Sequence, residues 1–131
     1  MIIVREDDIN LNLARLDDNG RYIIMEAEVQ GSPFSFVNIY APSSVQDQCC
    51  FYYNLNKNIE ENIIGKDIRI ILGGDFNVTL YPVWDCSGGN QSKKASAKLI
   101  EDLCLDFDLI DIWRKTKETS YPEKTRRLVN Q

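Results

Sequence analysis

The chain has 131 residues, of which 44% are apolar and 27% are charged, and its formal net charge at pH 7 is -5. These values are typical of one globular domain, and the negative charge argues against a chain whose main task is to grip nucleic-acid phosphates, because that affinity comes largely from Lys and Arg. No apolar run approaches the roughly 20 residues that a membrane helix needs, and the segment Met1–Asp8 turns acidic too early for a secretory signal. We therefore expect an intracellular protein with no membrane partner.

The first third of the chain predicts strands joined by tight turns. The expected strands cover residues 9–16, 21–29 and 34–40. Apolar and polar side chains alternate in the first of them, which is the period of a half-buried strand. Asn19-Gly20 then predicts a hairpin turn, because both residues accept positive φ. A second turn is expected at Gln30–Pro33. Three consecutive strands joined in this way form an antiparallel meander.

The apolar period changes to that of a helix after residue 50. Phe51, Leu55, Ile59 and Ile63 recur every four residues, which predicts a helix with one apolar face that ends at Gly65. The remaining expected elements are a strand at 68–72, a loop at 77–90, a second helix at 92–107 and a short strand at 109–113. The fold class is therefore α+β, an antiparallel meander followed by helix, strand, helix and strand, with helices covering a sheet face.

An apolar run ending at Leu72 leads into Gly73-Gly74 and then to Asp75 and Asn77, which lie two residues apart. Apolar residues suit a buried strand, and the glycine pair frees the backbone at its carboxyl end. Asp75 and Asn77 would then emerge where open α/β sheets bind ligands. Asp and Asn also favour turns, so a purely structural role in shaping this turn is the alternative.

Three segments occur in an order that resembles the endonuclease/exonuclease/phosphatase superfamily. They are Asn38-Ile39-Tyr40-Ala41-Pro42, Gly73-Gly74-Asp75-Phe76-Asn77 and Leu109-Ile110-Asp111-Ile112-Trp113-Arg114. Asp85-Cys86-Ser87 also looks like the family's Asp-x-Ser. The chain resembles in particular the apurinic-endonuclease-like domain of non-LTR (LINE-type) retrotransposons. We therefore expect residues 1–114 to form the central part of such a domain, and 115–131 to be a poorly ordered polar tail.

The resemblance implies a four-layer, DNase I-like α/β sandwich that hydrolyses DNA phosphodiesters with Mg²⁺, and a nuclear location. It assigns Asp75 to orienting or deprotonating the attacking water, Asn77 to hydrogen-bonding the scissile phosphate, and Tyr40 to donating its hydroxyl there. These residue types suit that chemistry, because a carboxylate can activate water while amide and hydroxyl donors meet charge on phosphoryl oxygens.

The sequence departs from the family pattern at both ends of the motif series. The family places a metal-binding glutamate before the Asn-x-Tyr-Ala-Pro segment, whereas here 37 residues precede Asn38 and neither Glu6 nor Glu26 lies in that context. The family also has a Ser-Asp-His signature after the Leu-Ile-Asp segment, and this chain contains no histidine. We therefore expect an internal fragment of the domain that is catalytically incomplete, with its metal ligands unassigned.

The expected incompleteness of the fragment also determines which partners we expect it to bind. The fragment is expected to bind Mg²⁺ unstably and nucleic acid weakly or not at all. The alternatives are a non-catalytic nucleic-acid- or protein-binding remnant, and a degenerate copy without function, so enzymatic activity stays open. Apolar faces left uncovered also predict self-association.

Overall fold

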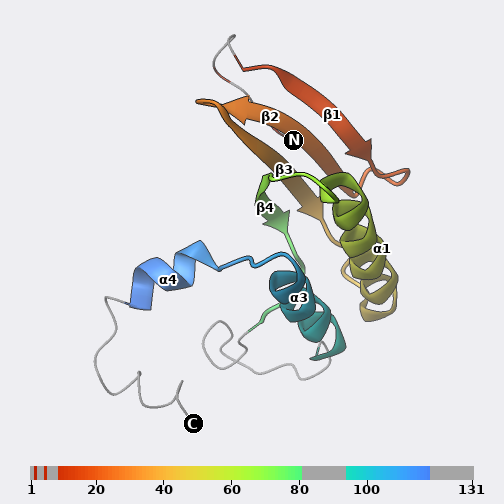
Figure 1. The fold of residues 1–131 in the computed structure, drawn as a ribbon. Helices are drawn as coiled ribbons and strands as arrows, with labels where there is room; N and C mark the ends of the chain where they lie inside the picture. Colours follow the sequence, from red (N-terminus) through yellow and green to blue (C-terminus); the bar gives the residue numbers. More distant parts are fainter. Residues whose placement is uncertain (1, 3–4, 6–8, 81–93, 119–131) are drawn as a thin grey trace.

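The computed structural model describes residues 2, 5, 9–80 and 94–118. In these residues it shows a mixed α+β architecture with a four-stranded sheet and helices, which confirms the α+β class of the prediction (Figure 1). The elements in chain order are β1 (Leu11–Leu16), β2 (Tyr22–Val29), β3 (Ser32–Tyr40), α1 (Val45–Ile63), β4 (Arg69–Asp75), α3 (Lys94–Asp106) and α4 (Ile112–Glu118). Each predicted strand of the meander and both predicted helices are present, with shifted ends.

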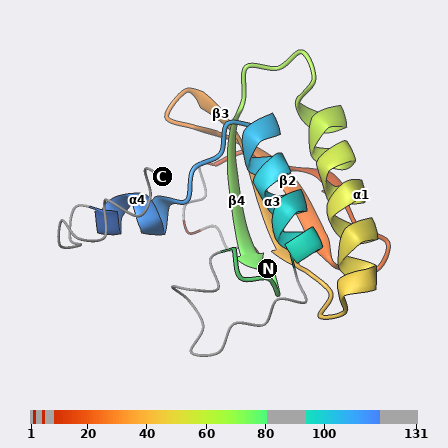
Figure 2. The same cartoon turned by 90° about the horizontal axis from the view of Figure 1, so that it is seen from below.

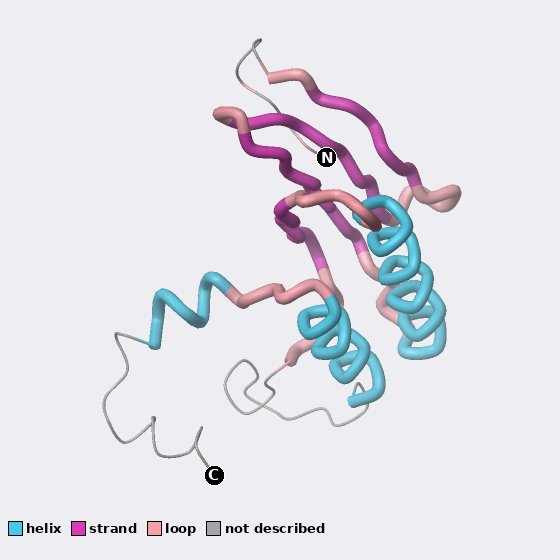
Figure 3. Tube along the Cα trace, viewed as in Figure 1, coloured by secondary structure: helices cyan, strands magenta, loops and turns pink. Residues whose placement is uncertain are grey.

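The sheet has the strand order β1-β2-β3-β4. The first three strands pair antiparallel, so the predicted meander is confirmed. The second turn is shorter than expected, because Ser32 already pairs with Val29 and only Gln30 and Gly31, both at positive φ, remain between the strands. Strand β4 pairs parallel to β3, and the long connection through α1 makes this possible (Figure 3).

Helices α1 and α3 pack side by side on one face of the sheet (Figure 2). The core forms between this face and the helices. Its buried members are Tyr22, Ile24, Val37, Ile39, Ala41, Phe51, Tyr52, Leu55, Ile59, Ile100 and Leu103. The stripe predicted for the first helix is thus buried at Phe51, Leu55 and Ile59. The helix begins earlier than predicted, because Ser44 caps it through a hydrogen bond from the Asp47 amide.

The strand predicted at 109–113 is wrong. Helix α3 ends in a Schellman motif, in which Asp108 has a φ of 51° and the Leu109 amide donates to the Cys104 carbonyl. A further helix, α4, then begins at Ile112, where the Asp111 carboxylate accepts a hydrogen bond from the Arg114 amide. A short apolar run cannot distinguish a strand from a helix by periodicity alone, and here the capping residues decide.

Other predictions fall partly outside the described residues. Residues 77–80 have no regular structure, as expected of a loop, while the rest of that loop and the Asp85-Cys86-Ser87 segment lie outside the described ranges. Residues 115–118 belong to α4, and 119–131 are not described, so the boundary between the 1–114 unit and its tail stays a prediction. In the described part of the chain no helix is long and apolar enough to cross a membrane.

Candidate functional site

Two of the sequence motifs meet at the carboxyl ends of β3 and β4. Tyr40 ends β3 and Asp75 ends β4, and the two residues are direct partners in the parallel register. The connection continues beyond the strands, because the Ala41 amide donates to the Asp75 carbonyl (2.8 Å) and the Asn77 side-chain amide donates to the Ala41 carbonyl (2.7 Å). The fold therefore brings all three predicted site residues to one edge of the sheet.

Gly74 allows the two strands to approach each other before this edge. Its φ is +130°, which side-chain-bearing residues rarely adopt. A Cβ atom at this position would overlap the backbone of Ile39, lying 2.8 Å from its nitrogen and closer still to its carbonyl oxygen. The second glycine of the motif is thus required by the backbone, and it fixes where Asp75 leaves the sheet.

Helix α1 holds the turn that carries the motif. The buried Gln48 donates through Nε2 to the carbonyls of Pro42 (2.7 Å) and Asn77 (3.0 Å). One turn further along, the Tyr52 hydroxyl donates to the Phe76 carbonyl at 2.5 Å. These contacts anchor both loops of the site to the same helix.

The Asp75 carboxylate is exposed, and its Oδ1 accepts a hydrogen bond from the Asn77 amide at 3.0 Å. Asn77 has a φ of 49°, the left-handed region that Asn tolerates in turns. Asp75 and Asn77 therefore do have the purely structural role that is the alternative to a catalytic one, since both residues shape the turn. The Asp75 side chain still faces solvent, where it can act on a ligand.

The charge of Asp75 affects the buried Tyr52 side chain. Burial raises the pKa of the Tyr52 phenol well above its ordinary value, and the Asp75 carboxylate raises it further. Tyr52 therefore stays protonated and remains a donor to Phe76 throughout the physiological range. The site thus combines an exposed acid with a buried neutral hydroxyl.

Arg21 is a site neighbour that sequence reasoning missed. Its guanidinium lies 5.4 Å from the centre of the Tyr40 ring, a cation-π contact, and the Tyr40 side chain is 58% exposed. Arg21 follows the first hairpin turn, and only the pairing of β2 with β3 brings it to Tyr40. Its position beside Tyr40 puts a positive charge near the carboxyl end of β3.

The described residues do not form a magnesium site on their own. Among them, no three His, Cys, Asp or Glu side chains lie close enough to share a metal ion. Asp75 supplies one carboxylate, and the amide nitrogen of Asn77 is engaged with Ala41. Mg²⁺ requires near-octahedral coordination by oxygen, so this donor set does not fit it.

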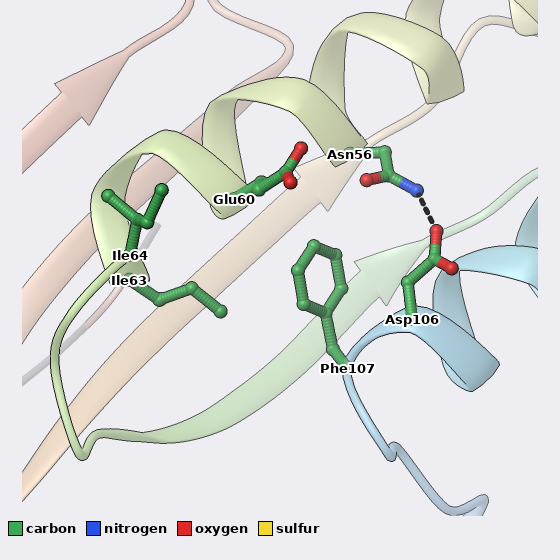
Figure 4. A pocket seen from close by; sticks show the side chains of 6 residues that line it. All are labelled: Asn56, Glu60, Ile63, Ile64, Asp106 and Phe107. Atoms are coloured by element: carbon green, nitrogen blue, oxygen red, sulfur yellow. Dashed lines mark hydrogen bonds between the residues drawn. The ribbon is translucent and has the colours of Figure 1, made fainter.

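A separate pocket lies between the carboxyl-terminal parts of α1 and α3, with a volume of about 440 Å³ (Figure 4). Its lining residues are Asn56, Glu60, Ile63, Ile64, Asp106 and Phe107. Asn56 donates to Asp106 across it at 2.8 Å. The pocket contains none of the predicted site residues, and it lies on the part of α1 that is remote from Gln48.

The chain is similar to a transposon protein. It is 32% identical over 98 residues to the transposon TX1 uncharacterized 149 kDa protein of Xenopus laevis. The matched region covers 73% of this chain and 7% of that protein's length. No protein-family model matches the chain. The similarity supports a transposon origin for this sequence.

Proposed function

We propose that the chain is part of an endonuclease/exonuclease/phosphatase-type domain of a LINE-type retrotransposon, and that its sheet belongs to a four-layer, DNase I-like sandwich. Tyr40, Asp75 and Asn77 belong to the pocket that handles a DNA phosphodiester. The similarity to a transposon protein and the order of the three motifs support this assignment.

The observation that carries the proposal is the direct pairing of Tyr40 with Asp75 at the carboxyl ends of two parallel strands. Ligands of open α/β sheets bind at such ends. There the Asp75 carboxylate can orient a water molecule, while the Tyr40 hydroxyl can donate to a phosphoryl oxygen. Arg21, stacked on Tyr40, adds positive charge that attracts a phosphate.

The residues that the structure describes do not complete this chemistry by themselves. Its described residues offer a single carboxylate at the site and no group of three metal-binding side chains, and the sequence has no histidine to serve as a proton donor. The chain therefore binds Mg²⁺ unstably and does not nick DNA without further residues. With a net charge of -5, it binds DNA weakly or not at all.

Plasmid nicking in the presence of Mg²⁺ tests the catalytic part of the proposal. We expect the wild-type chain, Asp75→Ala and the control Asp67→Ala to leave supercoiled plasmid equally intact. Asp67 is an exposed acid before β4 and outside the site. Nicking by the wild type and Asp67→Ala that is lost in Asp75→Ala would show that the chain is a complete nuclease.

A second measurement tests the site assignment without requiring turnover. A concentrated phosphodiester dinucleotide is titrated into the isotope-labelled chain, and backbone amide shifts are followed by NMR. We expect the amides of Tyr40, Asp75 and Asn77 to shift more than those lining the separate pocket at Glu60 and Phe107. Shifts spread evenly over the surface would contradict the assignment.

A further inference from the structure

The row of the sheet next to Tyr40 and Asp75 carries one polar side chain. Asn38 lies on β3 two residues before Tyr40, and in the register it pairs with Ile23 of β2 and with Gly73 of β4. Alternate residues of a strand point to the same face, so the Asn38 side chain shares the face of Tyr40. Along β3 the two residues are roughly 7 Å apart at the usual rise per residue. Asn38 therefore lies within one row of the proposed phosphodiester site.

Gly73 leaves a gap beside Asn38. It lies two residues before Asp75 on β4, and it shares the face to which Asp75 belongs. A Cβ atom built at Gly73 meets nothing within 4 Å. Gly73 is not among the glycines with positive φ, so its backbone conformation, unlike that of Gly74, does not require a glycine. The effect of glycine at this position is the open space where a side chain would otherwise lie.

This gap adjoins the ends of the two parallel strands. Tyr40 faces Asp75 at the strand ends, and Asn38 faces Gly73 one row further in. Because Gly73 has no side chain, Asn38 supplies the side chain of the inner row between β3 and β4. A group that binds between Tyr40 and Asp75 can therefore extend one row deeper, beside the Asn38 amide.

The Asn38 amide needs a hydrogen-bond partner. Its side chain is half-buried, and no hydrogen bond joins it to another residue that the structure describes. Its neighbours Ile23, Phe36 and Ile71 on this face are apolar. In the proposed sandwich a second sheet covers this face, and a polar group enclosed there costs free energy unless it is hydrogen-bonded. The partner is then either a side chain of that second sheet or the bound substrate.

The position of the gap favours the substrate. Ligands of α/β sheets bind at the carboxyl ends of the strands, which is where the gap at Gly73 lies. An asparagine amide supplies two N–H donors, and phosphoryl oxygens accept hydrogen bonds. Hydrogen bonds to a charged acceptor are stronger than those between neutral groups. A phosphodiester therefore satisfies Asn38 better than a neutral side chain does.

We propose that Asn38 is a further substrate-binding residue of the site, and that its Nδ2 donates to a phosphoryl oxygen of a phosphodiester seated in the gap at Gly73. This inference rests on the proposed function, because it takes Tyr40 and Asp75 as the outer edge of the same site. Tyr40 and Asn38 then donate to one phosphate group from successive rows of the sheet.

Titration of the dinucleotide dTpdT into the isotope-labelled chain, followed by NMR, tests the Asn38 contact. We expect the side-chain amide signals of Asn38, identified by their absence from the Asn38→Ala spectrum, to shift together with the backbone amides of Tyr40 and Asp75. Asn38→Ala should weaken binding by about fivefold or more, because it removes a donor to a charged acceptor. The matched control is Asn12→Ala, at an exposed asparagine of β1 on the opposite face, which should leave the affinity unchanged.

Gly73→Val tests whether the phosphate occupies the gap. Valine suits a strand and fills the open space, so the chain should keep its stability in denaturant unfolding while dinucleotide binding falls by about tenfold or more. A variant that binds dTpdT as tightly as the wild type overturns its own half of the proposal, either the Asn38 contact or the seat at Gly73. In that case continued shifts at Tyr40 and Asp75 leave the site assignment in place. No shift at Tyr40 and Asp75 would overturn the site assignment, and this inference with it.

Discussion

Gln48 in the first turns of α1 donates one hydrogen bond to the Asn77 carbonyl and another to the Pro42 carbonyl, at 3.0 and 2.7 Å. A single buried amide thus ties together the loops that follow β3 and β4, the two strands that end in Tyr40 and Asp75. Because each loop is also bonded to the other through Ala41, the three segments form one hydrogen-bonded unit. The geometry of the site therefore depends on a residue that does not face solvent.

Gln48→Met keeps the length of the side chain but removes both donors. The partly buried carbonyls of Pro42 and Asn77 then lose these two bonds, and we expect the free energy of unfolding to fall by about 2–3 kcal/mol. Urea denaturation followed by circular dichroism measures this loss. Gln46→Met is the control, because Gln46 lies exposed on the same helix and should change stability little. Equal stability of the two variants would show that the Gln48 bonds contribute nothing.

We expect the folded chain to lose stability at alkaline pH because of Tyr52. Burial, with a further contribution from Asp75, raises the pKa of its phenol in the folded chain. Below the ordinary tyrosine pKa of about 10 the phenol is protonated in both states, so its contribution to stability is complete. Above that pH the unfolded chain loses the proton first, and stability falls as pH rises. Burial also raises the pKa of Tyr22 and of Cys104, which adds to the same trend.

Tyr52→Phe isolates this contribution. At neutral pH the variant loses the bond to the Phe76 carbonyl, which should cost about 1–2 kcal/mol. The difference in unfolding free energy between wild type and variant should narrow as pH rises above about 10. Only the wild type has a phenol that must stay protonated in the folded state while it ionises in the unfolded state. Urea unfolding at neutral and alkaline pH measures the gap. Tyr53→Phe, at a side chain that is 68% exposed, should match the wild type at both.

Asp108 ends α3 with a φ of 51°, a conformation that glycine adopts without strain. Asp108→Gly should therefore stabilise the chain by about 0.5–1 kcal/mol. Thermal unfolding measures the change. The comparison is Glu101→Gly, at an exposed position in the interior of α3, where glycine should lower stability by about 1 kcal/mol. A destabilised Asp108→Gly chain would contradict the capping argument.

Much of this architecture follows from local signals. The Asn19-Gly20 turn and the four-residue stripe of α1 each predicted an element that the structure contains. The motif order also brought Tyr40, Asp75 and Asn77 into one hypothesis, and parallel pairing of β3 with β4 does place them together. Register across the sheet cannot be read from local periodicity, because it depends on which strands become neighbours.

The features that the sequence did not reveal are of this non-local kind. Arg21 reaches Tyr40 only through the pairing of β2 with β3. Gln48 precedes the apolar stripe that predicted the helix, and its burial follows from the loops that close over it. The error at 109–113 has a different cause, since Asp108 and Asp111 there act as caps, and capping overrides a short apolar pattern.

The glycine pair before Asp75 offers a matched comparison within the site. Gly74→Ala adds a Cβ where the Ile39 backbone already lies and imposes an alanine at a φ of +130°. The strands must move apart, so we expect a loss of about 3 kcal/mol or more and displacement of Asp75 from Tyr40. Gly73→Ala adds the same atom at a position where nothing lies within 4 Å and the φ is ordinary, and should be tolerated. Denaturant unfolding gives the stability of each variant, and NMR shifts of the Tyr40 and Asp75 amides report the register. Similar behaviour of the two alanine variants would mean that β3 and β4 do not approach as closely at Gly74 as the argument requires.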